Sequence, residues 1–426
     1  MSRSKQVRKY LLPTLLIAVL LVSVGAYTSY TIGNQPKPNP NVYVGVAFGG
    51  NTTQEAITLI NRVKAYTNLF ILDAGRNVLT QNETAVEEIC NYAVANGLSV
   101  IINVGVEIRN DTSRFWFWQQ PLNVTEQWKA MWGDKFLGMY YNDEPGGIQL
   151  DGNWSAWFRT YGQYYLQLRN SSKTASDLYQ IYLKLLAFMD NGTNPSNYNA
   201  EANFFVRDVL EGDSGLNALK TAEVTTFTSD YALYWFDYLG GYNVIFTELG
   251  WNCSIAEQIA LVKGAARLQD KQWGAMITWT YDSAPYLDNG DQIYDQMLTS
   301  FEAGAKYIAI FDYPYNGSNE YGALNTQQFS AIQRFWDDIH QQEFPNLSDP
   351  VGALVLPQNY GWGMRDPNDT IWGFWPPDSK TIEVATAMST LLSQYGVSLD
   401  IVYYDPQFPV ASVSYQHVYY WNQTGI

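Results

Sequence analysis

The chain has 426 residues, of which 46% are hydrophobic and 15% charged, so it is long and apolar enough for one large core and a smaller unit. Its net charge of −16 opposes binding to nucleic acid or to any acidic surface, and we expect no nucleic-acid partner. Aromatic residues make up 15% of the chain, led by 32 Tyr and 15 Trp.

The N-terminus has the pattern of a targeting segment. Basic residues between Arg3 and Lys9 precede an apolar run over residues 11–27, which predicts a signal anchor or a signal peptide at 1–28. Cleavage near Val24-Gly25-Ala26 would give a secreted form, so both forms stay open, and the signal anchor is preferred. The basic flank predicts a cytoplasmic N-terminus and an extracellular remainder. The proline-rich residues 29–41 predict an extended linker.

The sequence also predicts a glycosylated, extracellular protein. Twelve Asn-X-Ser/Thr sequons follow the leader, against roughly three expected by chance from the composition, at Asn51, Asn82, Asn110, Asn123, Asn153, Asn170, Asn191, Asn252, Asn316, Asn346, Asn368 and Asn422. The two cysteines, Cys90 in a predicted helix and Cys253 in a distant loop, are not expected to form a disulfide.

Strand-like and helical segments alternate from residue 42 onward. Short apolar runs predict eight strands, at residues 42–48, 68–73, 98–104, 136–142, 224–229, 244–247, 274–280 and 307–311. Helical spacing between them, and again at 326–340, predicts an α/β fold of the (β/α)8 TIM barrel class. A doubly wound open sheet is the alternative, but Gly49-Gly50-Asn51 is not the phosphate loop that usually follows its first strand.

Two further segments complete the predicted organisation. A helical insertion after the fourth strand, at 146–220, belongs to a barrel that spans 42–345, with helices expected near 156–168, 175–189 and 198–210. Residues 346–426 predict a small C-terminal unit with a partial flavodoxin-like pattern. Its strands are expected at 351–357, 397–404 and 417–421, with a helix at 381–394.

Acidic residues gather at the predicted strand ends. In a TIM barrel these ends meet at one rim, where the active site forms, and the acids expected there are Asp73, Glu107, Asp143, Glu144, Asp230, Glu248, Asp282 and Asp312. Aromatic side chains in the same loops suit stacking on sugar faces, and they include Trp116, Trp118, Tyr140, Trp251, Trp279, Tyr281 and Tyr313.

The end of the fourth strand carries the most specific motif, Asn142-Asp143-Glu144-Pro145. It resembles the Asn-Glu-Pro motif of a large clan of retaining glycoside hydrolases with (β/α)8 barrels, with one additional Asp. The resemblance implies that Glu144 is the acid/base. The clan also has a nucleophilic Glu at the end of the seventh strand, where this chain has Thr278-Trp279-Thr280-Tyr281-Asp282. Glu248, at the end of the sixth strand, is the nearest substitute.

A carboxylate pair of this kind predicts cleavage of glycosidic bonds in a polysaccharide or glycan. Glu144 would donate the proton, Asp143 would raise its pKa by like-charge repulsion, and Glu248 would be the ionised partner. A separation of about 5 Å would imply retention of configuration and about 6.5–9.5 Å inversion, and both stay open. The residues expected to bind substrate are Asp73, Asp230, Trp251, Trp279, Tyr281, Asp282 and Asp312.

Other kinds of site have less support. The only histidines, His340 and His417, lie outside the predicted rim, so neither a Ser-His-Asp triad nor a metal site is expected, and no cofactor is expected. The turn from Asp288 to Asp291 lacks the full ligand pattern of a calcium loop. The alternative function is a non-catalytic cell-surface glycoprotein with a barrel for carbohydrate binding or envelope structure. The oligomeric state is left open.

Overall fold

The computed structural model describes residues 41–73, 78–107, 119–152, 196–251, 253–313 and 319–423. The chain divides into two compact units, residues 1–40 with 338–343 and residues 41–337 with 344–426. The predicted leader and most of the linker, and the helices expected near 156–168 and 175–189, lie outside the described residues. None of the helices within the described ranges is both long and apolar enough to cross a membrane.

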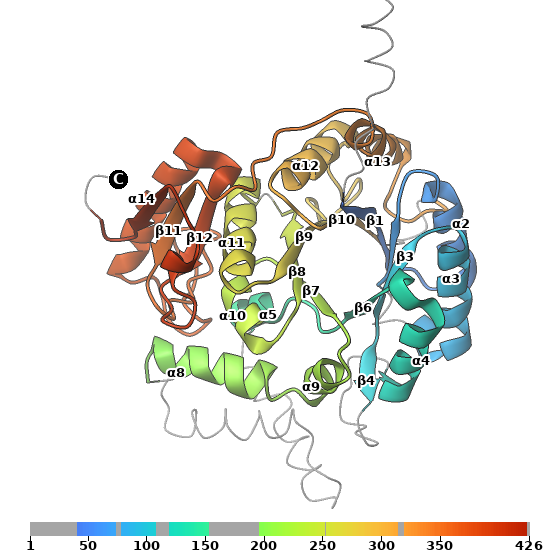
Figure 1. Ribbon diagram of the computed structural model, residues 1–426, viewed down its shortest axis with the longest axis horizontal. Helices are drawn as coiled ribbons and strands as arrows, with labels where there is room; N and C mark the ends of the chain where they lie inside the picture. The colour runs from blue at the N-terminus through green and yellow to red at the C-terminus, as the bar shows by residue number, and fades with distance from the viewer. Residues whose placement is uncertain are drawn as a thin grey trace, which may run out of the picture. The chain divides into compact units, whose positions relative to one another are not determined.

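A closed barrel of eight parallel strands forms the centre of the second unit (Figure 1). The strands follow one another around the ring in chain order, as β1 (Tyr43–Phe48), β2 (Leu69–Leu72), β3 (Ser99–Asn103), β6 (Phe136–Tyr140), β7 (Thr226–Asp230), β8 (Val244–Leu249), β9 (Gln272–Ile277) and β10 (Tyr307–Asp312). The last strand pairs with the first, with Tyr307 opposite Tyr43, which closes the ring. The predicted TIM barrel is confirmed, and the open sheet is excluded.

Helices connect most of the strands and surround the barrel (Figure 1). Their bounds are α2 (Thr53–Val63), α3 (Glu83–Ala95), α4 (Leu122–Trp132), α5 (Pro145–Asp151), α8 (Tyr198–Asn203), α9 (Ser214–Thr221), α10 (Tyr234–Gly240), α11 (Ile255–Leu268), α12 (Gly290–Glu302) and α13 (Thr326–Ile339). A π-helical segment, Phe204–Leu210, directly continues α8, so the helix predicted at 198–210 is present. A short parallel pair, β4 (Gly105–Glu107) with β5 (Gln119–Pro121), follows β3.

Side chains fill the inside of the barrel. Alternate strand positions point inward, and the buried interior cluster includes Phe227, Phe246 and Tyr307, whose rings contact one another with centroids 5.2–6.0 Å apart. Because both faces of the strands are covered, the strands read as nearly continuous apolar runs, and this is why they were predictable from sequence. The barrel is therefore a packed core, with chemistry confined to its rim.

The C-terminal residues form a second, smaller sheet. Three parallel strands lie in the order β12 (Leu399–Tyr403), β11 (Gly352–Leu356), β13 (His417–Tyr420), with α14 (Ser379–Tyr395) connecting β11 to β12. A buried ion-pair cluster fixes this sheet to α11, because Asp400 of β12 lies 3.1 Å from the Lys263 ammonium and 2.6 Å from Nε of Arg267. The small α/β unit predicted after the barrel is thus present and packs against it.

Candidate active site

The site is built around the end of β6, where the chain leaves the barrel. After Tyr140, Asn142 and Glu144 adopt left-handed backbone conformations, with φ of 56° and 50°, so the strand ends in a sharp turn. Pro145 then occupies the first turn of α5, a position that its fixed φ favours. The turn places Asp143 and Glu144 at the carboxyl rim, as the sequence predicted.

Asp230, at the end of β7, holds this turn in place. Its Oδ2 accepts a hydrogen bond from the Gly146 amide at 2.6 Å, and its Oδ1 accepts one from the Gly147 amide at 2.9 Å. A Cβ on Gly146 would lie only 2.6 Å from the Ala232 carbonyl oxygen, so the close approach requires glycine. Asp230 is fully buried and bound to backbone amides, which corrects its expected role: it positions Glu144 instead of facing substrate.

Close polar contacts join three strand ends beneath the rim. The Tyr140 hydroxyl donates to Oδ1 of Asp143 at 2.5 Å, and its oxygen lies 2.7 Å from Oγ of Ser229. The Ser229 hydroxyl donates to Oε1 of Glu248. The Ser229 amide also donates to the Tyr140 oxygen at 3.1 Å. Asp143 of the turn and Glu248 of β8 thus each accept a hydrogen bond from one of two neighbouring hydroxyl groups.

Glu248, at the end of β8, is a buried carboxyl group with a shifted pKa. It is 6% exposed, and burial raises its pKa well above the usual value, with the nearby charges of Glu144 and Asp143 acting in the same direction. The hydrogen bond from Ser229 opposes this shift. These causes favour a protonated Glu248, whereas the sequence predicted Glu248 as the ionised member of the pair.

Tyr140 was expected to stack on a sugar, and the structure gives it another role. Its side chain is 1% exposed, so its ring faces the core and not the solvent. Burial raises the pKa of Tyr140 well above its ordinary value, and the charges of Asp143, Asp73 and Glu248 add to the effect. The neutral phenol donates its one proton to Asp143 and so orients that carboxylate.

Asp73, at the end of β2, lies on the opposite side of the mouth from Glu248. Its Oδ1 accepts a hydrogen bond from Nδ2 of Asn103 at the end of β3, at 2.5 Å. The carboxylate is half-buried and its charge acts on Tyr140. Asp73 therefore lies where a substrate-binding residue was predicted.

An aromatic wall forms the side of the mouth at β8, β9 and β10. The ring of Trp279 contacts four others, with centroid distances of 5.7–6.5 Å, namely those of Trp251, Tyr286, Phe311 and Tyr313. Trp251 is 51% exposed and its amide donates to the Trp279 carbonyl at 2.8 Å, so the two loops are joined. The wall offers flat apolar surface beside the acids, which suits a sugar face.

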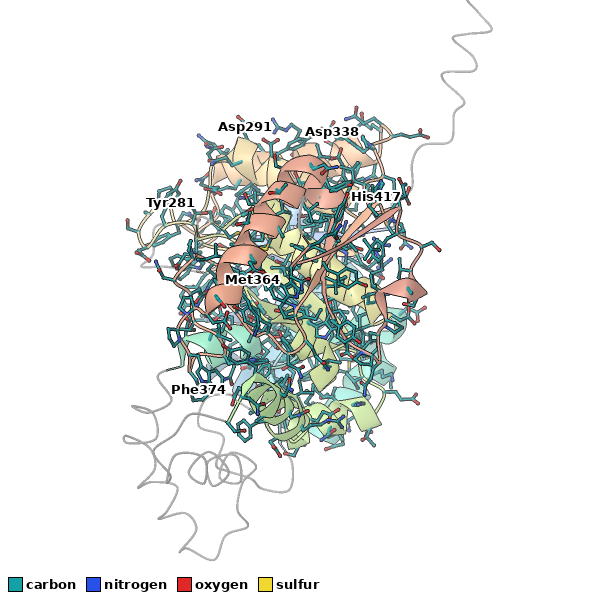
Figure 2. All side chains as sticks on the ribbon, turned by 90° about the vertical axis from the view of Figure 1, so that its left-hand side faces the viewer. Tyr281, Asp291, Asp338, Met364, Phe374 and His417 are labelled. Atoms are coloured by element: carbon teal, nitrogen blue, oxygen red, sulfur yellow. The ribbon has the colours of Figure 1, made fainter. Side chains whose placement is uncertain are left out.

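The remaining predicted residues divide between loop and core. Tyr281 and Asp282 are exposed on the loop after β9, and Tyr281 projects from it (Figure 2). Asp312 is buried, and its Oδ1 accepts hydrogen bonds from the amides of Ala323 and Leu324 at 2.8 and 3.1 Å. Asp312 was expected to bind substrate; it fixes a loop, as Asp230 does. Trp116 and Trp118 lie outside the described residues.

Sequence reasoning missed Ser229 and Asn103, which hold Glu248 and Asp73. Both are polar residues at the ends of apolar strands, and this was the available signal. No carboxylate follows β9 directly, where Thr278 and Trp279 stand. Among the described residues, no group of three or more His, Cys, Asp or Glu side chains has the arrangement of a metal site. The thiols of Cys90 and Cys253 are free.

Comparison with known proteins gives only remote likenesses. No protein-family model matches the chain, and no curated protein matches it by sequence. A solved GH5_18 structure from Streptomyces cattleya, in complex with GlcNAc, covers 90% of this chain and 99% of its own at 12% identity and a TM-score of 0.45.

A GH5_18 structure from Bifidobacterium longum subsp. infantis covers 90% of this chain and 97% of its own at 9% identity and a TM-score of 0.46. A GH30 endoxylanase from Clostridium papyrosolvens covers 71% of this chain and 73% of its own at 9% identity and a TM-score of 0.39. The fold itself is established by the strand pairing of this chain.

Proposed function

We propose that this protein is an exported glycoside hydrolase that cleaves glycosidic bonds with Glu144 and Glu248 at the barrel mouth. The observation that carries the proposal is the electrostatic coupling of the two carboxyls, because the charge of Glu144 raises the pKa of the buried Glu248. Two interacting acids, one protonated and one ionised, are what hydrolysis of an acetal requires. The exposed aromatic wall beside them supports a carbohydrate substrate.

In the proposed reaction, Glu248 gives its proton to the leaving glycosidic oxygen while the bond from that oxygen to the anomeric carbon breaks. Glu144 remains ionised and acts on the other face of the sugar. It either attacks the anomeric carbon directly, giving a glycosyl ester that water later hydrolyses, or takes a proton from an attacking water. The first course retains configuration and the second inverts it. The Ser229 hydroxyl orients Glu248, and the Tyr140 hydroxyl orients Asp143 beside Glu144.

Substrates with different leaving groups test the roles of the two acids. Glu248→Gln should lose activity on natural glycans yet keep much of it on dinitrophenyl glycosides, whose leaving group departs without protonation. Glu144→Gln should lose activity on both. The opposite pattern would restore the predicted assignment with Glu144 as donor. Wild-type activity in both variants would remove the pair from catalysis.

A non-catalytic carbohydrate-binding protein is the second candidate. The deep burial of Glu248 and the absence of a carboxylate directly after β9 favour it. Such a protein would bind glycans through the aromatic wall without cleaving them. The two candidates separate when wild-type protein is incubated with a glycan panel: binding lost in Trp251→Ala, with no product formed over days, would support the second.

We also propose that the protein is carried to the cell surface, where the N-terminal segment anchors it in the membrane and glycans cover the exported part. Six sequon asparagines fall within the described residues, and all six are exposed, namely Asn51, Asn82, Asn123, Asn346, Asn368 and Asn422. This supports glycosylation, since an oligosaccharide needs an accessible acceptor. Mass spectrometry of protein from its native source should find glycans at these positions, and unmodified asparagines at all of them would refute this part.

A further inference from the structure

A second cleft lies at the end of the barrel away from the acid pair. It is lined by Asn243 and Lys271, which directly precede β8 and β9, whereas the candidate active site is at the carboxyl ends of the strands. The other wall comes from the C-terminal unit, through residues 358–359 and 405–408. Its volume of about 660 Å³ falls in the range of roughly 300–1,000 Å³ that is typical of small-molecule sites.

The C-terminal wall of this cleft is where a ligand site is expected in an α/β unit. β11 and β12 are adjacent parallel strands, so the segments that follow them leave the sheet at the same, carboxyl edge. Gln358 and Asn359 follow β11, and Asp405 to Phe408 follow β12. In open parallel sheets, ligands bind outside the carboxyl ends of the strands.

The charges in the cleft favour an anionic ligand. Lys220 and Lys271 both line it. Burial lowers the pKa of Lys271, and repulsion from the charge of Lys220 lowers it further. Neither ammonium forms an ion pair within the part of the chain that the structure describes. Because the chain has 41 acidic and only 25 basic residues, two neighbouring lysines that form no ion pair there are a distinctive feature of this cleft.

The acids that line the cleft already have partners. Oε2 of Glu211 lies 3.1 Å from Nη1 of Arg207, and Oδ1 of Asp405 accepts a hydrogen bond from the Gln407 amide at 2.8 Å. The uncharged polar lining includes the side-chain amides of Gln358 and Gln407, and the apolar lining includes the half-buried Phe408. Amide groups bind hydroxyls, and an aromatic face suits a sugar ring.

We propose that this cleft binds a sugar that carries a negative group, with Lys220 and Lys271 holding the anion and the wall of the C-terminal unit holding the hydroxylated ring. The anionic group is either a carboxylate or a phosphate, since both accept several hydrogen bonds from ammonium groups. The site is separate from the acid pair, so it does not depend on the proposed hydrolysis.

Calorimetric titration of the full chain tests the proposal, with glucuronate, glucose 6-phosphate, glucose and inorganic phosphate as probes. At least one of the two sugar anions should bind, more weakly as NaCl is added, and glucose should not. Lys220→Met and Lys271→Met should each weaken binding about tenfold, as expected when one charged hydrogen bond is lost. Lys135→Met removes the same charge outside the cleft and should leave the affinity unchanged.

The preferred probe identifies the anionic group. Failure of both sugar anions to bind at millimolar concentration would overturn the proposal, and so would unchanged affinity in the Lys220→Met/Lys271→Met double variant. Inorganic phosphate binding as tightly as glucose 6-phosphate would overturn the recognition of a sugar ring. Circular dichroism and thermal unfolding of each variant, compared with Lys135→Met, confirm that a lost signal is not a lost fold.

Discussion

At the scale of single residues, the chemistry of the mouth depends on how four carboxyl groups share few protons. Burial, and next the charges of Glu144 and Asp143, raise the pKa of Glu248 well above its ordinary value, which favours a neutral carboxyl there. This group is more deeply buried than Asp73, Asp143 and Glu144, so burial favours the proton there. The hydrogen bond from Ser229 acts in the opposite direction and lowers the pKa of Glu248.

Ser229→Ala should move the pH dependence of hydrolysis in a defined direction. The Ser229 hydroxyl stabilises ionised Glu248, so its removal raises the pKa of Glu248 further. Because a general acid must be protonated, the alkaline limb of the kcat/KM profile should shift to higher pH. Measurement of kcat/KM from pH 4 to about 10 on one glycan substrate gives the shift.

Thr278→Val is the matched control, since Thr278 is also a buried hydroxyl residue at a strand end but forms no hydrogen bond with Glu248 in the described part of the chain. Its alkaline limb should stay at the wild-type pH. A Ser229→Ala profile that shifts to lower pH, or one that only falls in height, would contradict the role of Ser229 as a partner of the acid.

At the scale of elements, α5 is the part that sets where Glu144 lies. Asp230 binds its first amides, and at its other end Asp151 pairs with Arg365 of the C-terminal unit at 2.7 Å. Gln149, in between, donates to the Trp372 carbonyl at 3.0 Å. The C-terminal unit thus supports the helix that follows the turn of Asp143 and Glu144, although the unit is far from this turn in sequence.

Asp230→Asn should disturb both stability and turnover. Both carboxylate oxygens accept backbone amides, and an Asn side chain would turn its own NH2 toward one of them. We expect a loss of about 1–3 kcal/mol in the free energy of unfolding, measured with urea, and a fall in kcat. Asp282→Asn, on an exposed loop, should change stability by less than about 0.5 kcal/mol. A raised KM with unchanged stability in Asp230→Asn would instead support direct substrate binding.

The buried ion pair between α11 and β12 allows a similar contrast. Lys263 and Asp400 have side chains that are 3% and 1% exposed, whereas Asp291, in its pair with Arg334, is 86% exposed. Lys263→Met leaves a buried carboxylate short of one partner and should cost about 3–5 kcal/mol. Asp291→Asn should cost at most about 1 kcal/mol. Equal losses in urea unfolding would show that the C-terminal unit does not depend on this cluster.

The strands could be predicted because each has a local apolar pattern, whereas the site could be predicted only in part. Burial on both faces makes a strand such as Leu69–Leu72 apolar throughout, and this is visible locally. The register between strands is not visible locally, yet it decides that Ser229 meets Tyr140 and Glu248. For the same reason, Asp230 and Asp312 looked like rim acids, because nothing in the sequence tells which backbone amides will surround them.

At the scale of the whole molecule, several carboxyls among the described residues are buried or partly buried and form no ion pair there, and they make stability depend on pH. Burial raises the pKa of Glu201 to about 8, with the hydrogen bond from Gln149 opposing it, and burial also raises the pKa of Glu257 to about 7. Asp237 is shifted upward in the same way, by burial and by the neighbouring Asp230. All of these groups bind a proton more tightly in the folded chain than in the unfolded one.

Stability should therefore fall as the solution becomes alkaline. A carboxyl with a raised folded pKa contributes fully below its unfolded value of about 4.3, and the contribution is lost as pH rises through the folded value, here about 7 to 8. Asp151 and Asp378 have lowered pKa values, so their contribution to stability is lost as the pH falls and not as it rises. The free energy of unfolding should thus be higher at pH 5.5 than at pH 8.5, by at least the roughly 1.4 kcal/mol of one pKa unit.

Glu201→Gln tests which group is responsible. Glu201 is fully buried in the described structure and bonded to Gln149, so an amide of the same shape removes the titration while keeping the packing. The difference between pH 5.5 and pH 8.5 in urea unfolding should shrink, chiefly because the variant is more stable than wild type at pH 8.5. Glu88→Gln, at an exposed position, should keep the wild-type difference. A chain that is more stable at pH 8.5 than at pH 5.5 would mean that these buried acids are ionised in the fold and paired with groups that the described contacts do not include.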